Sequence, residues 1–143
     1  MRFMILRKAD KQTEAGVMPS EALLAAMGAY MEAMSKAGVL LSGEGLQPSA
    51  KGARVKLSGG RPTVIDGPFA ETKELVAGFC IIQTKSRQEA IDWVKRWPPL
   101  DGDVEIEIRQ IFEAEDFGAE FTPKLRAAEE RMREEAAARG AKH

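Results

Sequence analysis

The pattern of apolar and polar positions along the chain predicts six short strands and three helices. Alternation is strictest in residues 104–109, where valine and isoleucine alternate with charged residues, as in a strand with one buried face. In the predicted helices, apolar residues recur every three or four positions. The predicted strands are residues 2–7, 39–41, 53–57, 61–65, 75–83 and 104–109, and the predicted helices are residues 20–37, 86–97 and 122–139.

Capping and turn residues define the ends of several of these elements. Ser20 can cap the first helix, and Ser86 with Glu89 has the spacing of a capping box at the second. Gly59–Gly60 is typical of a short hairpin turn between two strands. Residues 10–19 are polar and include a glycine and a proline, so we predict a loop there.

The order of these elements predicts an α+β fold of the ferredoxin-like βαββαβ type. Strand–helix–strand occurs twice, with a hairpin inserted between the halves and a C-terminal helix appended. Both inner helices then cover one face of the sheet. Residues 75–83 form a nearly unbroken apolar run, as in strands buried on both faces, so the other face also needs a cover. We therefore expect two copies to pair, sheet against sheet, as a homodimer.

Composition argues against several broad classes of function. The chain has 143 residues, of which 44% are hydrophobic and 30% charged, and its formal net charge is −1. That length suffices for one core, and the charge balance gives no general attraction to nucleic acid or to an anionic membrane. We find neither a stretch long enough to span a membrane nor a signal peptide, and we expect a cytoplasmic protein.

Cofactor and metal chemistry have little support in the sequence. Cys80 is the one cysteine and lies in an apolar run, where we expect a buried, unreactive thiol. Gly43 and Gly45 lack the later glycine of a dinucleotide-binding fingerprint. His143, the last residue, is the one histidine. We expect neither a cofactor nor a metal ion.

One polar stretch lies between the predicted hairpin and the apolar strand. Residues 66–74 read Asp-Gly-Pro-Phe-Ala-Glu-Thr-Lys-Glu, and all nine positions resemble the signature of the DGPF branch of the YCII-related family. Flanking segments resemble the family as well, at residues 43–48, 77–79 and 106–109. The resemblance covers about residues 1–112 of the chain.

This resemblance implies a ferredoxin-like domain that pairs into a dimeric α+β barrel. We place the domain at residues 1–113 and a C-terminal helical extension at residues 114–143. The YCII branch proper is associated with a His–Asp pair in a cleft. Since His143 is the one histidine here, that pair is not carried over. Membership of the DGPF branch implies no particular reaction.

Asp66 is the candidate catalytic residue, as a general base or as an acceptor of hydrogen bonds from a substrate. Glu71 and Lys73 follow on the same loop, where the lysine would contact an anion or carbonyl and the glutamate would orient it. The alternative is a purely structural turn. Asp66 would then bind backbone amides just downstream, Gly67 would adopt a positive φ, and Phe69 would anchor the turn in the core.

Glu44 and Arg109 are further candidate substrate-binding residues. Arg109 is predicted to project with Glu105 and Glu107 from one face of the last strand. These charges either remain solvated, as on many edge strands, or line a cleft between two sheets. In the cleft, Arg109 would pair with Glu44 or bind an anionic ligand. Glu44 lies between two glycines, where a backbone can approach a ligand or form an ordinary bulge.

Two functions of different classes follow from these residues. The first is a homodimer that binds an unidentified small polar metabolite in a cleft, with or without transforming it. The second is a non-enzymatic regulatory or protein-interaction module that docks through the Asp66 loop and the last helix. The sequence leaves enzymatic activity open between the two.

Overall fold

The computed structural model describes residues 1–140 and divides the chain into two compact units, Met1–Ile111 and the segment from Phe112 onward. The strands are β1 (Arg2–Lys8), β2 (Leu40–Gly45), β3 (Ala53–Ser58), β4 (Arg61–Asp66), β5 (Val76–Gln83) and β6 (Ile106–Gln110). The α-helices are α1 (Lys11–Glu14), α2 (Glu21–Lys36), α3 (Arg87–Val94) and α4 (Pro123–Gly140). The 3₁₀ helices are η1 (Ser49–Lys51), η2 (Thr72–Glu74), η3 (Pro99–Asp101) and η4 (Ala114–Glu120).

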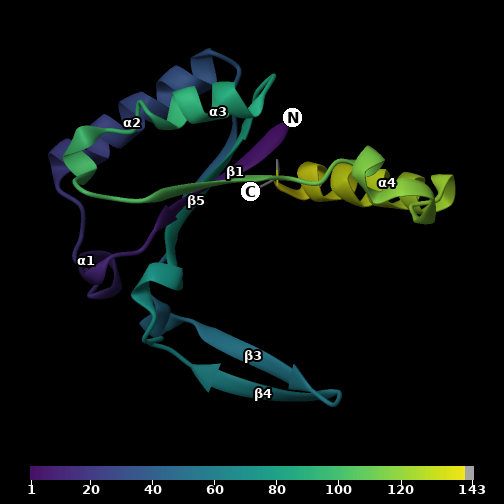
Figure 1. Ribbon diagram of the computed structural model, residues 1–143, viewed down its shortest axis with the longest axis horizontal. Helices are drawn as coiled ribbons and strands as arrows, with labels where there is room; N and C mark the ends of the chain where they lie inside the picture. Colours follow the sequence, from purple (N-terminus) through teal and green to yellow (C-terminus); the bar gives the residue numbers. More distant parts are fainter. Residues whose placement is uncertain (141–143) are drawn as a thin grey trace. The chain divides into compact units, whose positions relative to one another are not determined.

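The first unit is built on a four-stranded sheet of order β2–β5–β1–β6, in which every neighbouring pair is antiparallel. The connections through α2 and α3 each pass over one strand before returning to the sheet. Both helices lie against the same face (Figure 1). This is the ferredoxin-like arrangement, so the predicted α+β fold class is confirmed.

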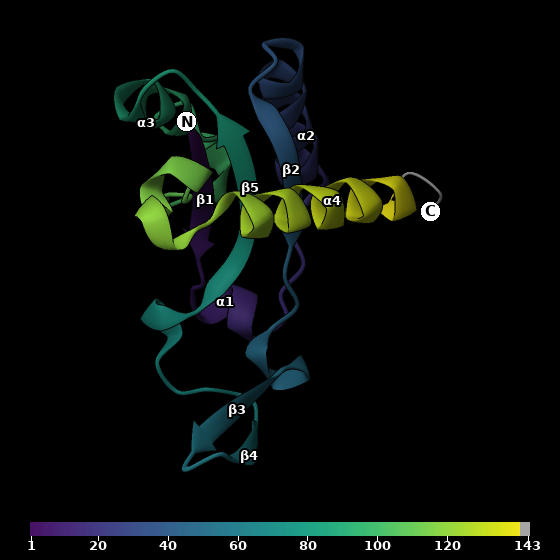
Figure 2. The same ribbon diagram turned by 90° about the vertical axis from the view of Figure 1, so that its right-hand side faces the viewer.

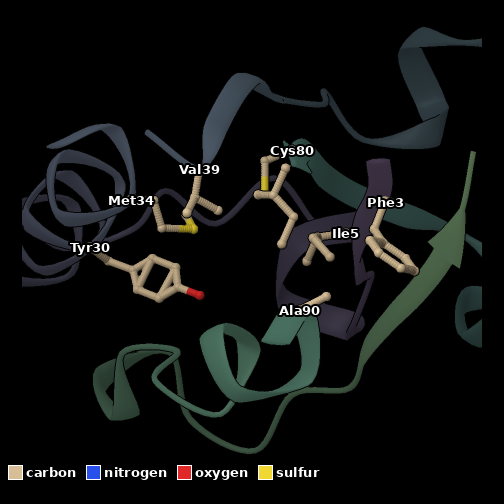
Figure 3. Close-up of a cluster of buried hydrophobic side chains, with 8 residues drawn as sticks. Phe3, Ile5, Tyr30, Met34, Val39, Cys80 and Ala90 are labelled. Carbon is tan, nitrogen blue, oxygen red and sulfur yellow. The ribbon is translucent and has the colours of Figure 1, made fainter. Parts of the chain in front are cut away.

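The core fills the space between the sheet and this pair of helices (Figure 3). Its buried side chains are Phe3, Ile5, Tyr30, Met34, Val39, Cys80, Ile82 and Ala90. Burying one large apolar side chain of this kind contributes about 1.5–3 kcal/mol. Burial also raises the pKa of the Cys80 thiol to about 11, so the thiol is protonated at neutral pH. The predicted burial of Cys80 is confirmed.

The largest differences from the predicted strand bounds are in β2 and β6 and have local reasons. β2 continues through Gly43 and Gly45, because their backbones still pair with Cys80 and Gly78 of β5. A register shift beside Leu41 lets this strand bend while it remains in the sheet. β6 begins two residues later than predicted, at Ile106. Hydrophobic pattern alone does not fix where hydrogen-bonded pairing starts.

The predicted loop at residues 10–19 contains a short helix, α1. Asp10 caps it: the carboxylate accepts a hydrogen bond from the Thr13 amide at 2.8 Å, and the Asp10 amide donates to Thr13 Oγ1 at 2.9 Å. Arg7 adds an ion pair to the same carboxylate at 3.2 Å. The hydrogen bond from the Thr13 amide has the largest effect on the Asp10 carboxyl and lowers its pKa, and the positive charge of Arg7 lowers this pKa further. The ionised carboxylate therefore stabilises the folded chain.

Asp10→Asn is expected to lower the free energy of unfolding by about 0.5 kcal/mol at pH 7, a small value because the carboxylate is partly exposed. Because the folded-state pKa of Asp10 is lowered, the ionised carboxylate stabilises the fold at pH values above the unfolded-state pKa of about 4. This stabilisation is lost as the pH falls through the folded-state pKa. The stabilities of wild type and variant should therefore converge below about pH 3. Urea unfolding of wild type and Asp10→Asn between pH 2 and 7 measures this difference in the free energy of unfolding. A difference that stays constant with pH would contradict it.

The β3–β4 hairpin forms a separate two-stranded sheet, as predicted. Gly59 and Gly60 form its turn with φ of +57° and +78°, values that favour glycine and match the twist of a hairpin. Both views show the hairpin beyond one end of the four-stranded sheet (Figures 1 and 2). The connection from β4 back to β5 contains residues 66–74.

The second unit consists of η4 and α4. Phe117 stacks on Phe112 and also contacts Phe121, with ring centroids 5.0 and 5.3 Å apart. Arg126 of α4 pairs with Glu115 at 3.1 Å and with Glu130 at 3.5 Å. α4 has no fully buried side chain between Pro123 and Gly140. Among the described residues, no helix is long and apolar enough to cross a membrane.

Candidate functional site

The connection between β4 and β5 is held by backbone contacts to η1. The Gly67 amide donates to the Gly52 carbonyl at 3.0 Å, and the Phe69 amide donates to Ser49 Oγ at 3.0 Å. Ser49 in turn donates to the Glu14 carboxylate, from its hydroxyl at 2.5 Å and from its amide at 3.0 Å. Glu14 of α1 therefore fixes η1, and η1 fixes the motif.

Gly67 is required by a close contact and not by its φ. The structure does not give it a positive φ, which corrects the predicted reason for the glycine. A Cβ added at Gly67 would lie 1.7 Å from the Ser49 carbonyl oxygen, a backbone atom that cannot rotate away. The peptide between Gly67 and Pro68 is cis.

Phe69 and Asp66 also differ from the predicted structural turn. Phe69 is half-buried outside the core and lies under the guanidinium of Arg54, whose Cζ is 3.9 Å from the ring centroid. Asp66, the last residue of β4, pairs with Ala53 through its backbone. Its carboxylate makes no hydrogen bond or ion pair with any residue that the structure describes. The expected capping of the turn by Asp66 is therefore wrong.

Asp66 is the last residue of β4, Glu71 and Lys73 lie on the connection from β4 to β5, and all three are exposed. Glu71 immediately precedes η2 and Lys73 lies within it. The Leu75 carbonyl then accepts a hydrogen bond from the Ala9 amide at 2.9 Å, which fixes the start of β5 beside the end of β1. Glu71 and Lys73 therefore precede the end of the four-stranded sheet at which β5 begins.

The sheet face opposite α2 and α3, called the second face below, carries two rows of side chains. Antiparallel register places one row across all four strands and a second row beside it. The rows are Glu44–Phe79–Leu6–Glu107 and Ser42–Ile81–Met4–Arg109. Each has two apolar residues of intermediate exposure at its centre and polar residues at its ends. Ile106 and Ile108 pack on the opposite side against the core, as predicted.

Glu44 and Arg109 lie at opposite edges of the second face. β5 and β1 separate their strands, which corresponds to about 14 Å at ordinary strand spacing. Arg109 pairs with Glu107 of its own strand at 3.3 Å, and both Arg109 and Glu44 are exposed. The predicted pairing of Arg109 with Glu44 therefore does not occur within one chain.

One chain does not gather the five candidates into a single enclosure. Glu44 lies at the same end of the sheet as Glu71 and Lys73, since Gly45 pairs with Gly78 near the start of β5. Asp66 lies at the base of the hairpin, and Arg109 lies at the far edge. A site that uses all five requires a second surface. Within residues 1–140 no group of three or more His, Cys, Asp or Glu is arranged for a metal ion, and His143 lies outside the described residues.

A partly buried ion-pair network also lies in the first unit, and the sequence did not reveal it. Arg7 donates two hydrogen bonds to Asp101, from Nη2 at 2.7 Å and from Nε at 3.1 Å. Trp97 Nε1 donates to the same carboxylate at 2.8 Å. The Asp101 hydrogen bond raises the pKa of Arg7. No spacing rule links residues this far apart in the sequence, and the same holds for the contact between Glu14 and Ser49.

Comparison with known proteins agrees with the fold. The YCII-related domain model matches residues 1–115, which is most of the chain. The chain belongs to the YCII-related family. A relative from Rhizobium meliloti (strain 1021), uncharacterized protein R00369, is 44% identical over 50 residues. That segment covers 35% of this YCII-related chain and 40% of the relative, so the match spans less than half of either protein.

One solved structure resembles this YCII-related chain distantly. It is 5-chloro-2-hydroxyhydroquinone dehydrochlorinase from Burkholderia phenoliruptrix AC1100, in complex with 2,5-dihydroxybenzoquinone. The identity is 19% and the TM-score is 0.42, over 79% of this chain and 96% of the other. At this level of similarity, neither the substrate nor the mechanism of that enzyme is transferred to this chain.

Proposed function

We propose that this chain, as a member of the DGPF branch, forms a homodimer that binds a small polar metabolite between the second faces of two copies. The observation that carries the proposal is the composition of that face. Met4, Leu6, Phe79 and Ile81 form an apolar centre, and charged residues stand at both edges. An apolar centre with a polar rim is the usual composition of a protein–protein interface.

Pairing by a two-fold axis would bring together residues that one chain keeps apart. The β2 edge of one copy can then approach the β6 edge of the other, so that Glu44 and Arg109 face each other across the boundary. Arg109 would bind a carboxylate or another planar anion with two hydrogen bonds. The ligand class that fits is therefore a small molecule with at least one anionic group.

The Asp66 loop supplies the remaining chemistry of the proposal. Asp66 would accept a hydrogen bond or a proton from the ligand, and its carboxylate is not engaged by any described residue. Lys73 would stabilise negative charge on the ligand, and Glu71 would orient the lysine. Proton transfer is the reaction step that these groups can perform without a cofactor.

A thermal-shift screen of polar metabolites on wild type and Asp66→Asn tests this function. A ligand at 100 times its Kd adds about 2.7 kcal/mol to the free energy of unfolding, which corresponds to several degrees in Tm. We expect a ligand that stabilises wild type and the control Asp103→Asn, an exposed carboxylate outside the proposed site. The same ligand should not stabilise Asp66→Asn, although that variant should keep its unliganded Tm because Asp66 is exposed.

Two outcomes would count against the proposal. Loss of stability in unliganded Asp66→Asn would indicate a structural role for the carboxylate. The absence of any stabilising ligand would favour the second candidate, an interaction module. The second unit supports that candidate, because it exposes Phe112 by 65%, Phe117 by 49%, Leu125 by 53% and Met132 by 61%. Exposed apolar residues in such number are typical of a docking surface.

A further inference from the structure

The β3–β4 hairpin has two chemically different faces. Residues directly opposite in an antiparallel pair project to the same side, and neighbours along a strand project to opposite sides. One side, the apolar hairpin face, consists of Ala53, Val55, Leu57, Pro62, Val64 and Asp66. The other side, the basic hairpin face, consists of Arg54, Lys56, Ser58, Arg61, Thr63 and Ile65.

The apolar hairpin face is exposed in the single chain. Val55 is 59% exposed, Val64 64% and Leu57 74%, and every residue of both strands is exposed. Three such side chains present on the order of 300 Å² of apolar surface, which is comparable to the largest apolar patch of a typical monomer, and such patches are often functional. A hairpin of two strands is also only marginally stable in water unless it packs on something else.

We propose that the apolar hairpin face docks on a second copy of this chain, so that the hairpin is a dimerisation arm. The inference rests on the proposed homodimer and specifies how that dimer is held. The first unit does not cover this face itself, since the hairpin extends beyond the end of its own sheet (Figures 1 and 2). Because both copies have the same arm, a two-fold axis places two such contacts in one dimer.

The area needed for a stable dimer supports a second copy as the occupant. Standard interfaces bury about 800 Å² on each partner. The centre of the second face offers four side chains that are already of intermediate exposure, namely Met4, Leu6, Phe79 and Ile81. Such a centre exposes only part of the required area. The arm adds on the order of 300 Å² of apolar surface per chain. Burial of both surfaces would bring the area buried on each chain closer to that of a standard interface.

Docking of the arm also changes the position of Asp66 with respect to the site. Asp66 projects from the apolar hairpin face, two residues beyond Val64 on β4. A docked arm therefore places the Asp66 carboxylate at the boundary between the copies. The binding site would then take Asp66 from one protomer and residues of the second face from the other. This accounts for the exposure of Asp66 in a single chain.

Two neighbouring substitutions on β4 separate the faces. Val64→Lys puts a charge on the apolar hairpin face, and Thr63→Lys puts the same charge on the basic hairpin face. Both positions are exposed in the single chain, so both variants should fold, which circular dichroism checks. Sedimentation velocity over a dilution series gives the dimer Kd. We expect Val64→Lys to raise this Kd at least tenfold and Thr63→Lys to change it less than threefold.

The outcomes distinguish this inference from the proposed function. A wild-type protein that is monomeric at micromolar concentration overturns the homodimer and the arm together. A wild-type dimer whose Kd is equally affected, or unaffected, by the two variants overturns the arm alone. In that case the pairing of the second faces, and the ligand site between them, would stand.

Cross-linking identifies what the arm contacts without weakening the dimer. Cys80 is buried, so Thr63→Cys, on the exposed basic hairpin face, introduces an accessible thiol that a benzophenone maleimide can label without altering the apolar hairpin face. Mixing ¹⁵N-labelled and unlabelled chains distinguishes cross-links between chains from those within one. We expect cross-links between chains. Cross-links confined to one chain, for example to residues 112–140, would overturn the proposal, as would the absence of any cross-link between chains in a stable dimer.

Discussion

Gly67→Ala is expected to lower the free energy of unfolding by about 3 kcal/mol, as overpacking against a fixed backbone does. The added methyl group would lie 1.7 Å from the Ser49 carbonyl oxygen. Relief requires η1 to move away, and this movement breaks the hydrogen bonds from Gly67 to Gly52 and from Phe69 to Ser49. Urea unfolding monitored by circular dichroism measures the loss.

Gly45→Ala is the matched control for that experiment. Gly45 has no heavy atom within 4 Å of its added Cβ and no positive φ, so its replacement should change stability by no more than about 0.5 kcal/mol. Equal effects of the two substitutions would show that the contact between Gly67 and η1 does not contribute as the structure indicates.

Asp101→Ala should lower the free energy of unfolding by about 2 kcal/mol, since Arg7 loses two hydrogen bonds and keeps only its ion pair with the partly exposed Asp10. The side chains of Arg7 and Asp101 are only 12% and 10% exposed. The substitution also removes the acceptor of the Trp97 indole N–H. Thermal and urea unfolding of the variant measure the effect.

A double-mutant cycle with Arg7→Met identifies the source of this loss. Removing both charges should cost clearly less than the sum of the two single substitutions, because the only described charge that then loses its partner is that of the partly exposed Asp10. Arg7→Lys should not restore wild-type stability, since an ammonium group cannot reproduce the two parallel hydrogen bonds. Additive single effects would contradict a coupled pair.

Most of the fold follows from local sequence signals that the structure confirms. Ser20 and Ser86 cap α2 and α3 by accepting hydrogen bonds from the amides three residues on. Gly59–Gly60 forms the hairpin turn. Helix α1 was not predicted because it has only four residues, too few for an apolar period to appear. Reciprocal hydrogen bonds between Asp10 and Thr13 cap it. Capping chemistry, not hydrophobic pattern, determines that helix.

The candidate site was less predictable, because its geometry depends on contacts between distant segments. The sequence identified residues 66–74 as a family motif. The structure shows that Ser49, which is bound by Glu14, accepts a hydrogen bond from the Phe69 amide of this motif. Nothing near Gly67 in the sequence reveals that η1 lies against it. The roles of Asp66, Glu71 and Lys73 remain predictions. They depend on a second surface that a single chain does not supply.

The central position of β1 has a consequence for how the chain folds during synthesis. Its two neighbours in the sheet, β5 and β6, are the last two strands to be made. While the ribosome synthesises the residues between β1 and β5, β1 and α2 have no sheet to join. In this interval the β3–β4 hairpin is the only part of a sheet that can form from local contacts. Apolar residues such as Phe3 and Ile5 stay exposed until β5 emerges, and this is the interval in which the nascent chain is most prone to aggregate or to need a chaperone.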